Sequence, residues 1–143
     1  MSFSETISPF FGRLAFVWFY GAAAMDILNN WHGVVHQMEV RQVPLAPVLL
    51  VVALVLIVLG CISLLFGYHT RHGAVLLFGL TIVAAFAMHD FWHIPEGATR
   101  WAEFDVFSRD IAICGGLLLM VGMGAGPFAI DNRAAGGGKG KRR

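Results

Sequence analysis

The stretch from Leu45 to Phe66 contains no charged residue, and it constrains the fold more than any other feature of the sequence. A helix of roughly 20 mostly apolar residues is long enough to cross the hydrocarbon core of a bilayer. The whole chain agrees, because 57% of its 143 residues are hydrophobic and only 13% are charged. So few charges cannot cover the surface of a water-soluble domain. The same composition excludes a disordered chain, and the net charge of +1 gives no basic surface for nucleic acid.

Three further apolar stretches are long enough to cross a membrane. They are Leu14–Asn29, which contains Asp26 near its end, Gly73–Met88, and Phe107–Gly126, which begins with Arg109 and Asp110. The connections between the stretches are short, so consecutive helices should be antiparallel neighbours. The sequence therefore predicts an all-α integral membrane protein, an antiparallel four-helix bundle. We expect a single domain over residues 1–131, with spans at about 11–29, 45–66, 72–90 and 107–126, and a disordered basic Gly-rich tail over residues 132–143.

The distribution of Lys and Arg predicts how the bundle is oriented. The turn Gly67–His72 shares one face with both termini, and the loops Asn30–Pro44 and Phe91–Asp105 lie on the other. Basic residues concentrate on the cytoplasmic side of membrane proteins, so both termini should be cytoplasmic. Seven basic residues lie on the terminal face, namely Arg13, Arg71, Arg133, Lys139, Lys141, Arg142 and Arg143, whereas the two loops carry Arg41 and Arg100.

Charged residues inside the predicted spans form the candidate site. Asp26 lies one turn before the end of the first span, His89 and Asp90 end the third, and Arg109 with Asp110 begins the fourth. Antiparallel threading brings all five to one depth near the outer face, where they should pair within the bundle. We expect Arg109 to bind the carboxylate of Asp26 or Asp90. The cluster is either an ion-pair clasp between helices or a binding site built on these residues.

Two histidine pairs raise further candidate chemistry at the same face. His32 and His36 are four residues apart, as are His89 and His93, so each pair would share one face of a helix. Such a set could ligate a transition metal, although solvated histidines at the membrane boundary have the same pattern. Haem would require two histidines facing each other across the bundle. A quinone headgroup would find His or Asp hydrogen bonds beside aromatic rings, here Phe86, Phe91, Trp92 and Phe104.

Two segments resemble a known family. They are Ala84–Trp92, which reads AAFAMHDFW, and Phe107–Leu119, which reads FSRDIAICGGLLL. Together they resemble the DoxX family of small bacterial membrane proteins. The resemblance implies a four-helix protein of the bacterial inner membrane that is an accessory subunit of a quinone-linked oxidoreductase complex. It would anchor a protein partner and contribute to a quinone site.

Two other interpretations of the function stay open. One is a purely structural or assembly component with no redox role, and the other is an outer-face metal-binding or small-solute-binding protein. The sequence has no nucleotide-binding loop and only two cysteines, Cys61 and Cys114. We therefore do not expect the chain to be a complete oxidoreductase by itself.

Overall fold

The computed structural model describes residues 3–124, 126 and 129–131, with side chains described from residue 7 onward. In these residues the secondary structure is entirely helical, which confirms the predicted all-α class. Four of the helices are long and apolar enough to cross a membrane. In chain order the elements are α1 (Phe3–Asn29), α2 (Trp31–Val40), α3 (Ala46–Phe66), α4 (Thr70–Met88), the short 3-10 helix η1 (Phe91–His93) and α5 (Ala98–Met123).

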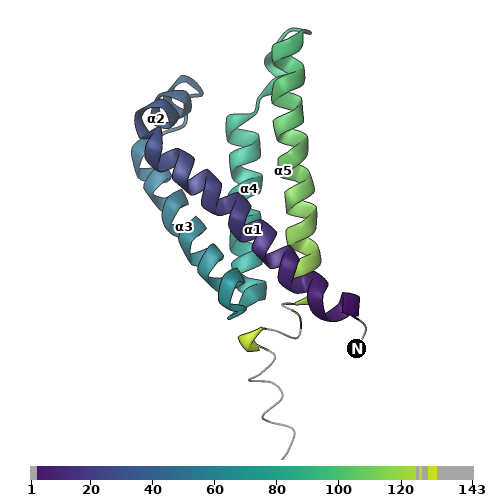
Figure 1. Cartoon of the computed structure of the whole chain (residues 1–143). Coiled ribbons are helices and arrows are strands. Elements are labelled where there is room, and N and C mark those ends of the chain that lie inside the picture. Colours follow the sequence, from purple (N-terminus) through teal and green to yellow (C-terminus); the bar gives the residue numbers. More distant parts are fainter. Residues whose placement is uncertain (1–2, 125, 127–128, 132–143) are drawn as a thin grey trace, which may run out of the picture.

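The four long helices form the antiparallel bundle that the sequence predicts (Figure 1). Helix α4 packs against both α3 and α5, while α1 packs against α3 and crosses the bundle obliquely. We call the end formed by α2, η1 and the first turns of α5 the loop end. The opposite end, formed by the start of α1, the turn at residues 67–69 and residues 124–131, is called the turn end. All described charge pairs with a contact of 3.0 Å or less lie at the loop end.

Small residues let the helices approach closely along their contact lines. A Cβ atom at Gly60 would lie 2.5 Å from Cγ of Leu77, and one at Gly116 would lie 2.7 Å from Cζ of Phe16. Between helices α1 and α4, the hydroxyl groups of Tyr20 and Thr81 are hydrogen-bonded. Lipid tails are as apolar as the protein interior, so close packing and such hydrogen bonds hold the bundle together. The outer surface is covered by large apolar side chains, as expected for contact with lipid.

Two boundaries differ from the prediction. Helix α5 begins at Ala98 rather than near Phe107, and much of the first predicted loop is the helix α2. Hydropathy missed the start of α5 because its first turns are polar. It missed α2 because this helix is short and none of its residues is buried. A helix is not obliged to end where its apolar segment ends. The predicted tail, residues 132–143, lies outside the described residues.

The turn end is closed by contacts between side chains and backbone groups. Gly67 ends α3 in the left-handed conformation, with φ 65°. The carboxylate of Asp131 accepts the N–H groups of His69 and Thr70, at 2.8 and 2.9 Å, and so satisfies the start of α4. Arg13 of α1 is buried and donates to the carbonyl oxygen of Leu64 at 3.5 Å. These contacts tie α1, α3, α4 and the chain after α5 together.

Candidate functional site

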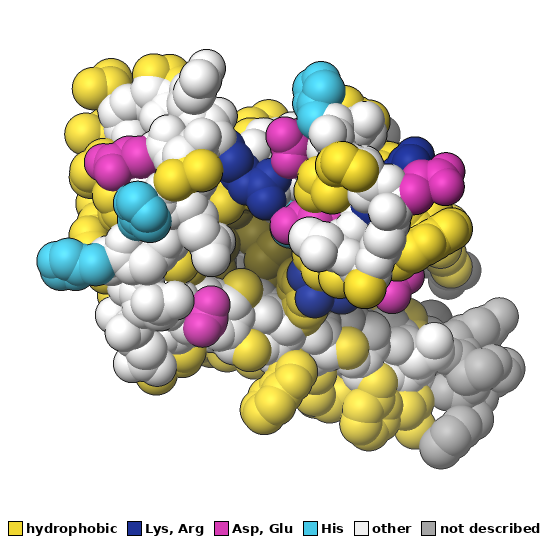
Figure 2. Space-filling model, turned by 90° about the horizontal axis from the view of Figure 1, so that it is seen from above, with side chains coloured by type: hydrophobic (Ala, Val, Ile, Leu, Met, Phe, Trp, Pro, Cys, Tyr) yellow, Lys and Arg dark blue, Asp and Glu magenta, His cyan; other side chains and the backbone are white. Residues whose placement is uncertain are grey.

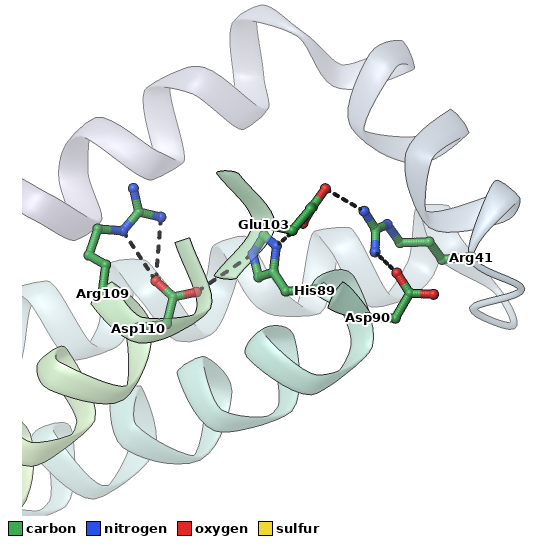
Figure 3. A network of polar contacts seen from close by, with 6 residues as sticks. All are labelled: Arg41, His89, Asp90, Glu103, Arg109 and Asp110. Carbon is green, nitrogen blue, oxygen red and sulfur yellow. Dashed lines mark hydrogen bonds and ion pairs between the residues drawn. The ribbon is translucent and has the colours of Figure 1, made fainter. Parts of the chain in front are cut away.

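Six ionisable side chains form a continuous network at the loop end (Figure 3). Arg41 follows α2, His89 and Asp90 follow α4, and the other three belong to α5. On α5, Glu103 and Asp110 are seven residues apart, which is two helical turns, so both face α4. The order of contacts along the network is Asp90, Arg41, Glu103, His89, Asp110 and Arg109.

Arg41 joins two helices through one guanidinium group. Its Nη1 lies 2.8 Å from Oδ1 of Asp90, and its Nη2 lies 3.0 Å from Oε1 of Glu103. The planar fork of an arginine can bind two carboxylates in this way, and such charge-assisted hydrogen bonds are among the stronger ones. Arg41 therefore fastens the end of α2 to the ends of both α4 and α5.

The imidazole of His89 lies between two carboxylates of α5. Its Nδ1 is 2.8 Å from Oε2 of Glu103, and its Nε2 is 3.8 Å from Oδ2 of Asp110. An ionised carboxylate only accepts hydrogen bonds, so the Nδ1 that faces Glu103 carries a proton and donates it. Asp110 is buried inside the membrane-spanning part of α5. His89 thus connects a buried acid to the exposed part of the network.

Arg109 is held differently from Arg41. Its guanidinium carbon lies 5.5 Å from the centre of the Phe19 ring, and its Nε and Nη2 each lie 3.4 Å from Oδ1 of the adjacent Asp110. The side chain is 56% exposed. The expected partners were Asp26 or Asp90, and the structure gives neither. Asp90 pairs with Arg41, and Asp26 is exposed on α1 without a polar partner among the described residues.

Figure 2 shows the loop end from above, with a hollow between the helices. Acidic and basic side chains lie along its walls, and apolar side chains lie at its floor. Two arginines and three carboxylates belong to the network, so its formal charge is −1 with His89 neutral and zero with His89 protonated. The hollow therefore presents both signs of charge at the boundary of the membrane-spanning region.

The structure does not bring the four candidate metal ligands together. His32 and His36 are exposed on α2, and the His93 side chain is 75% exposed on η1. Helix α4 ends at Met88, so His89 and His93 do not share a helix face. Within the described part of the chain, no group of three or more His, Cys, Asp or Glu residues is placed to hold a metal ion.

Sequence reasoning missed Arg41 and Glu103, which make the shortest contacts of the network. Arg41 was counted only for orientation, and Glu103 was placed in a loop because the predicted fourth span began at Phe107. One signal was available, since Glu103 precedes Asp110 by seven residues. Extending the helix backward by two turns would have placed both carboxylates on one face.

The fold and its apolar surface define a multi-span helical membrane protein. The sequence profile of the SURF4 family matches residues 46–135, which include α3, α4 and α5. The chain therefore belongs to the SURF4 family. The assignment to the DoxX family was wrong, and the role as a subunit of a quinone-linked oxidoreductase, which depended on it, is overturned as well. In the Gly-Gly-Leu-Leu-Leu string that supported that assignment, Gly116 lies at a contact with Phe16 of α1, and small residues are common at such contacts in any membrane bundle.

Individual relatives come from yeasts and from bacteria. The chain is 32% identical over 81 residues to the Surfeit locus protein 4 homolog of Schizosaccharomyces pombe, covering 55% of this chain and 26% of that protein. It is 25% identical over 79 residues to the ER-derived vesicles protein ERV29 of Saccharomyces cerevisiae, covering 55% and 25%. It is 27% identical over 127 residues to the inner membrane protein YqjF of Escherichia coli, covering 89% and 92%. The chain thus spans about a quarter of the yeast proteins but nearly all of the bacterial one. No solved structure gives a significant match.

Proposed function

We propose that the chain is a membrane receptor that holds a polypeptide partner in the charged hollow of its loop end. The observation that carries this proposal is the network itself, in which charged groups of both signs line a hollow that is open to solvent (Figure 2). Ionisable residues inside a membrane protein are costly and therefore mark functional sites. A polypeptide segment offers backbone N–H and C=O groups as well as charged side chains, which suit such walls.

Two members of the network are the most available to a ligand. Asp90 is 45% exposed, and Arg109 is 56% exposed with its guanidinium group resting on the Phe19 ring. Asp26 on the neighbouring α1 adds an exposed carboxylate. His89 and Asp110 lie deeper. Asp110 contacts Arg109 directly, and His89 is linked to Asp90 through Glu103 and Arg41. These five residues, all singled out from the sequence, are the proposed ligand-binding set.

The names of two relatives agree with a membrane setting for the proposed receptor and suggest its location. The name of the Saccharomyces relative associates that protein with vesicles derived from the endoplasmic reticulum. The Escherichia relative, which this chain covers almost completely, is named an inner membrane protein. We therefore propose a bacterial inner membrane as the location, with both termini in the cytoplasm and the loop end outside. In this arrangement residues 1–131 form one membrane domain.

Photo-crosslinking from inside the hollow tests the proposed function. Phe19 lies beneath the guanidinium group of Arg109, and its aromatic ring can be replaced conservatively by the photoreactive amino acid p-benzoylphenylalanine. Trp18 is adjacent on α1 but is 79% exposed on the lipid-facing surface, which makes it a matched control position. After irradiation of intact cells, we expect discrete polypeptide adducts from position 19 and none of the same mass from position 18.

A second substitution ties the adduct to the network. Arg109→Gln removes the exposed cation but leaves the crosslinker position unchanged, so the adduct at position 19 should weaken. Arg100→Gln serves as the control, because Arg100 contacts only the exposed Glu96, at 3.6 Å, among the described ion pairs. The same adducts from positions 18 and 19, or adducts insensitive to Arg109→Gln, would contradict the proposal and leave the network as a clasp between helices.

A further inference from the structure

A second feature lies at the opposite end of the molecule and is independent of the charged hollow. A groove of about 530 Å³ runs between the outward faces of α3 and α4 at the turn end. Ligand sites in proteins fall in the range of roughly 300–1,000 Å³. The side walls are apolar and consist mainly of Leu59, Ile62 and Phe66 from α3 and Leu76 from α4. Because α3 and α4 span the membrane, these walls face the hydrocarbon region.

Small residues form the floor of the groove. A Cβ atom at Gly73 would collide with the hydroxyl oxygen of Ser63, so the two helices touch there and the larger side chains stand on either side. The Ser63 hydroxyl donates to the carbonyl oxygen of Tyr68 at 2.8 Å, which leaves no polar hydrogen for a ligand. The floor and walls therefore offer an apolar channel, which suits a hydrocarbon chain.

Polar rings close the groove at its aqueous end. Tyr68, His69 and His72 line this end, with ring centres 4.2 Å apart for the first two and 5.5 Å apart for the last two. The backbone of His69, with φ 51°, is held by the Asp131 carboxylate, which accepts its N–H at 2.8 Å. Imidazole N–H and phenol O–H groups can donate to phosphate oxygens. An apolar channel with hydrogen-bond donors at its membrane boundary matches an amphiphile with a phosphate headgroup.

Arg71 at the turn end and the basic composition of the sequence after residue 131 favour a negatively charged headgroup. Ile130 lines the groove, and the following residues 132–143 carry five basic residues and no acidic one. Arg71 is exposed at the same end of the bundle and donates to the carbonyl oxygen of Gly122 on α5 at 3.3 Å, so it adds a cation at this membrane boundary without lining the groove. Lys and Arg side chains near a membrane surface attract anionic lipid. We infer that this groove binds an anionic glycerophospholipid, with one acyl chain between α3 and α4 and the phosphate at Tyr68, His69 and His72.

Native mass spectrometry of the full chain tests this inference, with phosphatidylglycerol and phosphatidylethanolamine as the probes. We expect one phosphatidylglycerol to stay bound per chain. The larger side chain of Ile62→Trp fills the groove, so the fraction of the chain that retains phosphatidylglycerol should fall about tenfold. Losing the burial of about two methylene groups of the acyl chain is enough to produce this change. Val58→Trp is the matched control, because Val58 lies one turn earlier on α3, is 50% exposed like Ile62 and does not line the groove.

The headgroup end is tested separately. His69→Ala combined with His72→Ala should reduce retention of phosphatidylglycerol, whereas His32→Ala with His36→Ala, on exposed histidines of the loop end, should not. Thermal unfolding of each variant shows that the chain still folds. Equal loss from Ile62→Trp and Val58→Trp would mean unspecific annular lipid and would overturn the site. Equal retention of phosphatidylethanolamine would overturn the anionic headgroup.

Discussion

The two ends of the bundle handle their charges in different ways. At the turn end, charged side chains contact the backbone: Asp131 accepts two N–H groups, and Arg13 donates to the Leu64 carbonyl. At the loop end, charged side chains contact each other, as in the bridge from Asp90 through Arg41 to Glu103. Backbone groups of a helix end have fixed positions, whereas paired side chains can exchange partners.

This difference separates a structural closure from a surface suited to binding. The turn end satisfies helix-terminal groups that would otherwise lack partners, and it joins four segments. The loop end leaves α2 partly exposed along its whole length and fastened through Arg41. We therefore expect substitutions at the turn end to change global stability and those at the loop end to change local opening and binding.

The largest effect is expected at Gly67, where the turn end is most tightly packed. An alanine there would carry its Cβ into the guanidinium group of Arg13 and to 2.6 Å from Cβ of Ala129, at a backbone φ of 65°. The left-handed conformation and the overpacking together should lower the free energy of unfolding by about 2–4 kcal/mol. Thermal or denaturant unfolding in detergent micelles measures this.

Gly79→Ala is the control for Gly67→Ala. Position 79 lies inside α4, and a Cβ there has no neighbour within 4 Å among the described residues. Alanine is the better helix former, so this variant should be as stable as the natural chain or slightly more stable. A similar loss of stability in both variants would contradict the view that the turn end is a closed structural joint.

Glu103→Gln tests the loop end with a change of charge but almost none of shape. The carboxylate contacts Arg41 at 3.0 Å and His89 at 2.8 Å, and both contacts lose their charge assistance. We expect the free energy of the local opening of α2 to fall by about 1.5 kcal/mol, which makes amide exchange there roughly tenfold faster. Hydrogen–deuterium exchange of α2 peptides measures this rate.

Glu96→Gln is the control, because Glu96 is exposed and is paired only with Arg100 among the described residues. It should leave the exchange of α2 unchanged. An unchanged exchange rate in Glu103→Gln would mean that the network does not hold α2.

Asp131 links stability at the turn end to pH. Although burial would raise the pKa of Asp131, the hydrogen bonds from Thr70 and His69 hold it below its ordinary value. An acid with a lowered pKa stabilises the fold above its unfolded value, about 4, and this stabilisation is lost as pH falls through the lower folded value. Asp131→Asn should cost about 1 kcal/mol at neutral pH and less at acidic pH. Unfolding curves measured from neutral pH down to about pH 3 test this. The prediction is refuted if the difference in the free energy of unfolding between the natural chain and Asp131→Asn does not narrow as the pH falls.

The sequence was sufficient for the bundle but not for the pairing of its charges. Uncharged stretches such as Leu45–Phe66 predict spans because hydrocarbon excludes charge, and α3 matches that stretch within one residue at its start. Pairing depends on where the helices end in water, and hydropathy says nothing about that. Helix α5 continues for two turns before its apolar part, which places Glu103 beside His89. Arg109 was assigned to the wrong carboxylates because Asp90 pairs with Arg41, whereas Arg109 contacts the adjacent Asp110.

His93→Ala should have the smallest effect and sharpens the comparison from within the loop end. His93 lies four residues after His89 and also contacts a carboxylate, with Nδ1 3.7 Å from Oδ2 of Asp90, but its side chain is 75% exposed. Ion pairs in solvent contribute little, so we expect a change of less than about 0.5 kcal/mol in the free energy of unfolding and unchanged exchange in α2. Unfolding and exchange of His89→Ala, measured in parallel, should both respond because His89 bridges Glu103 and Asp110. If His93→Ala and His89→Ala changed unfolding and exchange equally, a position at the loop end would be enough to stabilise it. Membership of the continuous network would then make no difference.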